Sequence, residues 1–161
     1  MATSATPNNN TDNDDNGVDN ANPQTNGIIS GVVTLTGEAE PDTPVDGDGT
    51  NGNLTVDFGF YAPLRLGNLV WKDFDNNGRK DANEPGVNGV IVELLRDANG
   101  DGKLDPPELT AVATRTTAGG GLYLFDNLAP GKYAVRLPAT NFQTNGALLG
   151  WLSSTPTSGS A

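Results

Sequence analysis

The most informative stretch of the chain, at residues 67–95, reads GNLVWKDFDNNGRKDANEPGVNGVIVELL and places an acidic loop between two apolar segments. The segment Leu66–Lys72 is mostly apolar, and Val90–Leu95 is apolar on both faces apart from Glu93. Short apolar runs of this kind are typical of strands, and the second is typical of a central strand in a sheet. The loop between them, Asp73–Glu84, is rich in Asp and Asn.

The rest of the chain repeats this pattern of short strands and turns. In Leu54–Phe60 the residues Leu54, Val56, Phe58 and Phe60 alternate with small or polar ones, which predicts a strand with one apolar face. Further strands are expected at Ile28–Thr36, Thr110–Thr117, Leu122–Phe125 and Lys132–Leu137. No window has a useful helical period. Many short strands joined by Gly/Pro turns predict an all-β, Ig-like sandwich, with Trp151 in its core.

Two loops of twelve residues have the spacing of calcium-binding loops. Oxygen-bearing side chains occupy positions 1, 3, 5, 9 and 12, glycine (Gly78 or Gly102) occupies position 6, and position 7 supplies a backbone carbonyl. The expected ligands are Asp73, Asp75, Asn77, Arg79 (carbonyl), Asp81 and Glu84 in the first loop, and Asp97, Asn99, Asp101, Lys103 (carbonyl), Asp105 and Glu108 in the second. Strands rather than helices are expected on both sides of these loops. The alternative is a pair of Asx-rich turns without metal, in which eight carboxylates would repel one another.

A third, incomplete loop lies near the N-terminus. Asp12, Asp14 and Asn16 keep the spacing of positions 1, 3 and 5, and Gly17 stands at position 6. The predicted ligands are Asp12, Asp14, Asn16, Val18 (carbonyl) and Asp19. Position 12 is Pro23, so another segment must complete the site. A plain polar tail is the alternative, because residues 1–27 have the composition of a disordered segment.

Composition limits what the protein can do. The net charge of −11 over 161 residues argues against a nucleic-acid partner. No apolar stretch approaches the roughly 20 residues of a membrane span, and the N-terminus predicts no signal peptide. The chain has no His and no Cys, which removes the usual general base, thiol nucleophile and zinc ligands. A carboxylate pair for glycoside hydrolysis remains conceivable, but we expect no enzyme and an extracellular protein stabilised by calcium.

The stretch at 67–95, together with YLFDNLAPGKYAVRLP at residues 123–138, resembles the SdrD-type B-domain family of bacterial surface proteins. The resemblance implies a calcium-stabilised sandwich that acts as a rigid spacer in adhesins and matrix proteins. The order of the parts is unusual. Residues 1–63 resemble the C-terminal half of one such domain, and residues 64–161 resemble the N-terminal half of the next.

The split order predicts that the sandwich is completed between neighbouring molecules. Joining of this kind is head to tail and gives open filaments unless a ring closes. We therefore expect a calcium-dependent subunit that is its own partner in an extracellular matrix or surface fibre. The alternatives are a monomeric spacer or ligand-binding module of an adhesin, an arbitrary cut from a repeat array, and a compact circular permutant.

Overall fold

The computed structural model describes residues 15–18, 20, 22–40, 49–53 and 55–155. The chain divides into two compact units, Met1–Tyr61 and Ala62–Ala161, which we call unit 1 and unit 2. Each unit is considered by itself. That they correspond to the two halves of a B-type domain, as expected from the sequence, stays a prediction.

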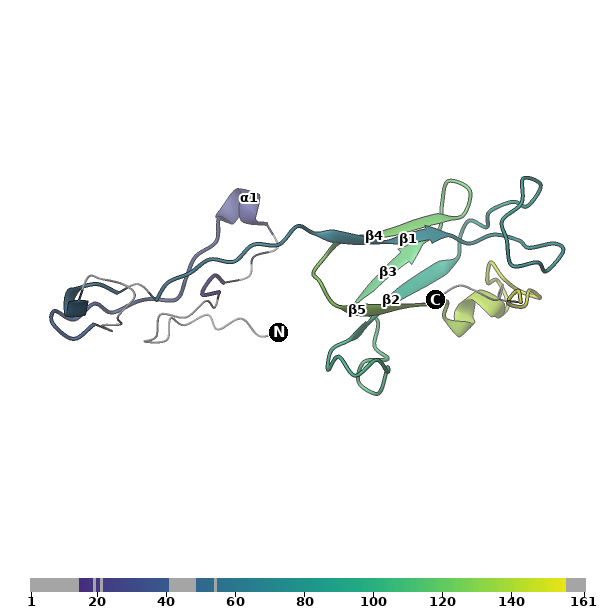
Figure 1. Ribbon diagram of the computed structural model, residues 1–161. Coiled ribbons are helices and arrows are strands. Elements are labelled where there is room, and N and C mark those ends of the chain that lie inside the picture. Colours follow the sequence, from purple (N-terminus) through teal and green to yellow (C-terminus); the bar gives the residue numbers. More distant parts are fainter. Residues whose placement is uncertain (1–14, 19, 21, 41–48, 54, 156–161) are drawn as a thin grey trace. The chain divides into compact units, whose positions relative to one another are not determined.

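Unit 2 consists of two antiparallel sheets (Figure 1). Strands β1 (Leu64–Leu69) and β4 (Leu122–Leu128) form one sheet. The other has the order β3-β2-β5 and contains β2 (Ile91–Asp97), β3 (Ala113–Thr116) and β5 (Lys132–Arg136). A 3-10 turn at Ala139–Phe142 follows β5. This arrangement confirms the predicted all-β, Ig-like fold class.

The hydrophobic core of unit 2 lies between the two sheets. Val92 and Leu94 alternate along β2 and point to the same side, where they meet Phe125 of β4. Val87, Val90 and Leu148 complete the buried cluster, and Trp151 packs against it as the sequence predicted. Burial of these apolar side chains supplies the main stabilising free energy of the unit.

Unit 1 contains little regular structure in the residues that the structure describes. It has a one-turn helix α1 (Pro23–Asn26), a 3-10 turn at Gly49–Asn51 and an isolated bridge between Gly17 and Ser30. The strands expected at 28–36 and 54–60 are not formed, and Leu54 lies outside the described residues. A strand needs a neighbouring backbone to pair with, and within the described residues neither segment has a ladder partner.

Most of the apolar side chains of these two unit 1 segments are left in solvent, whereas Ile28, Val33 and Val56 are half-buried. Val32 is 96 % exposed and Phe60 is 81 % exposed, and Ile29, Leu35 and Phe58 are also exposed. Exposed apolar side chains gathered on short segments mark interaction surfaces more often than isolated ones do. None of the helices in the described part of the chain is long and apolar enough to cross a bilayer.

Candidate metal centre

The first acidic loop is closed at its base by short antiparallel pairing. Trp71 forms a bridge with Gly86, and the Lys72 amide donates to the Pro85 carbonyl over 2.9 Å. One step further into the unit, the Val87 amide donates to the Val70 carbonyl over 2.8 Å. These bonds bring Asp73 and Glu84, the first and last residues of the loop, close together at its base.

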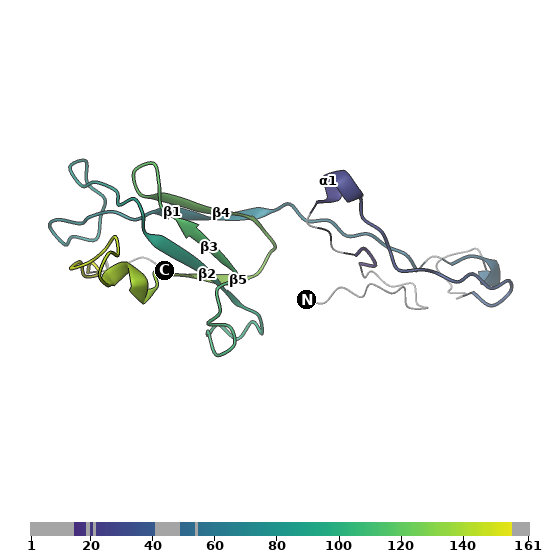
Figure 2. The same ribbon diagram turned by 180° about the vertical axis from the view of Figure 1, so that it is seen from behind.

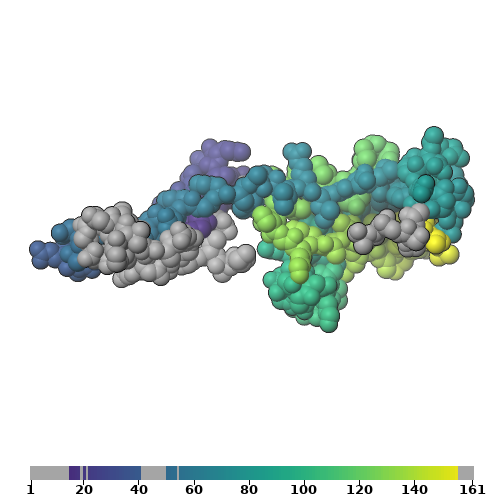
Figure 3. All heavy atoms as spheres, in the orientation of Figure 1, coloured from purple at the N-terminus to yellow at the C-terminus, as the bar shows by residue number. Residues whose placement is uncertain are grey.

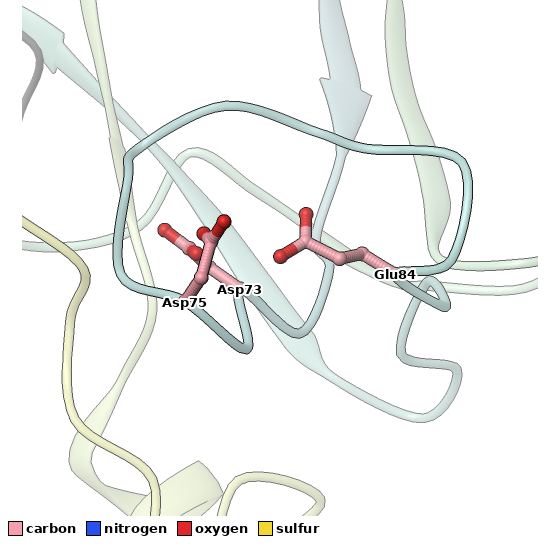
Figure 4. A group of neighbouring side chains, drawn as sticks. All are labelled: Asp73, Asp75 and Glu84. Atoms are coloured by element: carbon pink, nitrogen blue, oxygen red, sulfur yellow. The ribbon is translucent and has the colours of Figure 1, made fainter.

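Three carboxylates of this loop converge. Oxygen atoms of Asp73, Asp75 and Glu84 all lie within 4.8 Å of one another, and the groups face each other across the loop (Figure 4). Ligand oxygens around one calcium ion lie 2.3–2.6 Å from it, so two of them are at most about 5 Å apart. The three carboxylates therefore fit a single calcium ion, and carboxylate oxygens are the ligands that this hard cation prefers.

Backbone hydrogen bonds hold these carboxylates in place. The Gly78 amide donates to Asp73 over 2.8 Å, and Gly78 has a φ of 74°, a conformation that favours glycine. Glu84 is buried and accepts hydrogen bonds from the amides of Phe74 (2.8 Å) and Asp81 (2.9 Å). The terminal glutamate thus ties position 12 of the loop to positions 2 and 9.

The environment of Asp73 favours its charged form. Burial alone acts to raise the pKa of Asp73, but hydrogen bonds from the Gly78 amide, the Ser154 hydroxyl and the Asn77 amide lower it. The net result is a pKa below the ordinary value of an aspartate. A carboxylate that stays ionised is the form that binds a cation.

The second loop repeats the hydrogen bonds of the first. The Gly102 amide donates to Asp97 over 2.8 Å, with a Gly102 φ of 84°. Glu108 accepts from the amides of Ala98 (2.8 Å) and Asp105 (3.2 Å), the residues at positions 2 and 9. Two loops that share no side-chain contact thus adopt the same internal pattern, as the shared spacing predicts. Among the described residues, only the first loop brings three carboxylates as close together as Asp73, Asp75 and Glu84.

The remaining predicted ligands of the two complete loops engage one another. The Asn77 side chain donates to Asp75 (2.9 Å) and to Asp81 (3.1 Å), so it links positions 3, 5 and 9. Asn77 and Asp101, both at position 5, accept hydrogen bonds from the amides of Arg79 (2.7 Å) and Lys103 (2.8 Å). The Asn99 side chain accepts from the Asp101 amide over 2.9 Å.

The third predicted site is described only in part. Asp12, Asp14 and Asp19 lie outside the described residues. The side chain of Asn16 is buried, and its oxygen accepts the Asp57 amide over 2.9 Å. Val18 is exposed, and its amide donates to the Ile29 carbonyl over 2.8 Å. Ion binding at this site stays a prediction.

The two complete loops lie at opposite ends of β2. The first precedes Ile91, and the second begins at Asp97, which is the last residue of the strand. The two ribbon views agree on this separation (Figures 1 and 2), and the second loop projects from the body of unit 2 in the space-filling view as well (Figure 3). A strand of seven residues is about 23 Å long, so each loop would hold its own ion.

Contacts from distant parts of the chain support both loops, and no sequence motif pointed to them. Asn76 of the first loop exchanges two hydrogen bonds with Thr155, of 2.9 and 2.8 Å. The Trp151 ring lies beside Phe74, with ring centroids 6.2 Å apart, and the Lys72 ammonium lies 4.9 Å from the Trp151 ring centre. At the second loop, the Lys132 ammonium donates to the Gly100 carbonyl.

Comparison with known proteins places this geometry in a family context. Residues 64–148 match the SdrD B-like domain. The chain is 42 % identical over 85 residues to serine-aspartate repeat-containing protein I of Staphylococcus saprophyticus, which covers 52 % of this chain and 4 % of that protein. It is 35 % identical over 117 residues to serine-aspartate repeat-containing protein C of Staphylococcus aureus, which covers 66 % of this chain and 12 % of that protein. The chain thus spans a small part of these relatives. No solved structure matches it.

Proposed function

Because the chain belongs to the SdrD B-like domain family, we propose that it is a calcium-dependent structural subunit that assembles head to tail into extracellular matrix or surface fibres. Binding, orientation and mechanical support, rather than catalysis, are the roles that its chemistry serves. The chain has neither His nor Cys, and eight of its 20 acidic residues lie in the two loops at the ends of β2.

Calcium binding is supported by the convergence of Asp73, Asp75 and Glu84 within 4.8 Å. It is also supported by the second loop, which repeats the hydrogen bonds of Asp73 and Glu84 at Asp97 and Glu108. A bound ion would offset the repulsion among these carboxylates and fix the shape of each loop. Calcium is present in the extracellular space at concentrations that weak modules of this kind can use.

Substitution of the terminal glutamate should weaken one site selectively. Glu84→Gln removes a charged ligand while keeping the size of the side chain, so we expect about tenfold weaker binding at the first loop, or ~1.4 kcal/mol. Glu108→Gln should do the same at the second loop. Isothermal titration calorimetry of both variants measures this. Glu93→Gln, which alters a carboxylate of β2 outside the loops, is the matched control. Equal calcium affinity in Glu84→Gln and the parent protein would contradict the assignment.

Self-assembly rests on one observation above all: within the described residues, unit 1 leaves most apolar side chains of 28–36 and 55–60 exposed and without a partner sheet. Only residues 61–63 join Phe60 to the start of β1 at Leu64. Three residues reach at most about 11 Å, while a seven-residue strand is about 23 Å long. The segment 55–60 therefore has too little chain to turn back and run alongside β1 in the same direction. A neighbouring molecule has no such restriction.

The size of the protein in solution tests this proposal. With millimolar calcium, multi-angle light scattering should show particles whose mass grows with protein concentration, and chelator should reverse the growth. A monomeric spacer or a ligand-binding module of an adhesin, the second reading of the sequence, would keep the mass of one chain in both conditions. Constant monomer mass at high protein concentration in calcium would exclude the assembling subunit.

A further inference from the structure

An apolar groove opens between the two sheets of unit 2 beside β5. It encloses about 410 Å³, far more than the roughly 30 Å³ that a water molecule occupies in the liquid. Its walls include Leu69, Trp71, Tyr123, Val135, Leu137 and Trp151. Both tryptophans of the chain therefore line it. The groove opens to solvent, so its apolar walls lack packing partners on that side.

Three features support a missing strand at the groove. Val135 faces the same side as the buried Leu94, its register partner on β2, yet it is 38 % exposed. Within the described residues β5 pairs with β2 alone, so its other edge is open. In addition, the indole nitrogen of Trp71 is buried without a hydrogen-bond partner among the described residues. Buried donors of this kind are normally paired.

We propose that residues 55–60 of a second copy of the chain add to the open edge of β5 and close this groove. The proposal rests on the proposed self-assembly and identifies the two surfaces through which neighbouring copies would bind, which we call the joint. Val56, Phe58 and Phe60 would enter the groove, where an apolar strand face is missing.

The hydrogen bonds of residues 55–60, which we call the donor segment, fit the role of an added strand. The amide and carbonyl of Asp57 both bond to Asn16, over 2.9 and 3.0 Å. The Gly59 amide bonds on the same side, to Asp15 over 3.2 Å. Because successive residues of a strand direct their backbone groups to opposite edges, Val56 and Phe58 direct theirs to the other edge. Among the described residues those groups have no partner, so they are available to β5.

Charge complementarity favours one register. The outward face of β5 carries two cations on either side of Ala134: Arg136, which is ion-paired with Glu93 over 2.7 Å, and Lys132, whose ammonium donates to the Gly100 carbonyl. The face of residues 55–60 that lies opposite Val56 and Phe58 carries a single charge, Asp57, between Gly59 and Thr55, which is buried within unit 1. With Asp57 opposite Ala134, its carboxylate lies diagonally between the two cations, within the reach of long side chains. In that register Val56 and Phe58 lie opposite Tyr133 and Val135, whichever way the donor strand runs.

Cysteine crosslinking tests the joint cleanly, because the chain has no cysteine of its own. Val135→Cys protein is mixed in calcium with Val56→Cys or with Phe58→Cys protein, and mild oxidant is added. We expect a disulfide-linked heterodimer with one of the two partners. Gly59→Cys, on the opposite face of residues 55–60, is the matched control and should give none, because a Cβ at Gly59 meets only Asp15 at van der Waals distance. In the unsubstituted protein, the fluorescence of Trp71 and Trp151 should shift to shorter wavelength as assembly proceeds.

The possible contrary results distinguish an error in the β5 joint from an error in the proposed self-assembly. Assemblies that form without crosslinking to Val135→Cys would overturn the β5 joint and leave self-assembly standing. Two double variants test whether the chain fills its own groove: Val135→Cys with Phe58→Cys, and Val135→Cys with Val56→Cys. A crosslink within one chain at high dilution would make the chain's own segment the occupant. That result also overturns the proposal. Failure of the unsubstituted protein to assemble in calcium would remove the proposed function, and the joint with it.

Discussion

In excess chelator, the melting temperature of the protein should fall by roughly 15 °C or more. Metal that binds only the native state stabilises it by about 4 kcal/mol per site at a thousandfold excess over Kd. For a unit of this size, 1 kcal/mol corresponds to about 4–8 °C in the melting temperature. Without the ion, the carboxylates of each loop also repel one another. Differential scanning calorimetry with calcium and with chelator measures the change.

Two controls identify the ion as the cause. Returning calcium above the chelator concentration should restore the original melting temperature, whereas the same concentration of magnesium should restore less of it. Magnesium demands a smaller, near-octahedral site and gives up its water reluctantly. An identical melting curve before and after chelation would show that the two loops are Asx-rich turns held by their own hydrogen bonds.

Deletion of residues 1–63 should convert the protein from a subunit that extends fibres into one that stops them. The truncated chain keeps the core of unit 2 and the groove beside β5, but it has lost the segments at 28–36 and 55–60 that would join the next copy. It can therefore accept a neighbour and cannot donate. Added to growing assemblies of the full chain, it should shorten them in proportion to its share of the mixture, as seen by electron microscopy.

A shorter deletion serves as the control. Removing residues 1–14 leaves both apolar segments in place and should preserve elongation if these segments carry the joint. Calorimetry should show that unit 2 still melts cooperatively in the longer deletion, which separates capping from misfolding. Polymerisation of the chain lacking residues 1–63, at the rate of the full chain, would exclude completion of one molecule by the other.

The strands of unit 2 could be predicted from the sequence because their partners lie within the same unit. The apolar run at Val90–Leu95 identified β2, whose neighbours β3 and β5 are both present. The same reasoning applied to 54–60 predicted a strand that the single chain does not form. Local pattern reports the tendency of a segment to pair, whereas pairing itself depends on a second backbone.

The candidate metal centre was predictable to the extent that it is local. The ligands of each loop lie within twelve consecutive residues, so the spacing of Asp, Asn, Gly and Glu was enough to group Asp73, Asp75 and Glu84. The support of the first loop by Thr155 comes from 79 residues further along the chain, and no spacing rule reaches that far. The groove beside β5 is likewise a property of packing and leaves no signature in the order of residues.

The position of the two loops also determines how folding proceeds. The pair Leu94 and Ala113 closes around the second loop alone, whereas the pair Leu69 and Leu122 of β1 and β4 encloses β2, β3 and both loops. Closing a longer stretch of chain costs more entropy, so β2 and β3 should pair before β1 and β4. Calcium in the second loop would then act early and speed refolding, while calcium in the first loop would act late and slow unfolding. In stopped-flow experiments, Glu108→Gln should lower the refolding rate and Glu84→Gln should raise the unfolding rate, and the reverse pattern would place the first loop in the folding nucleus.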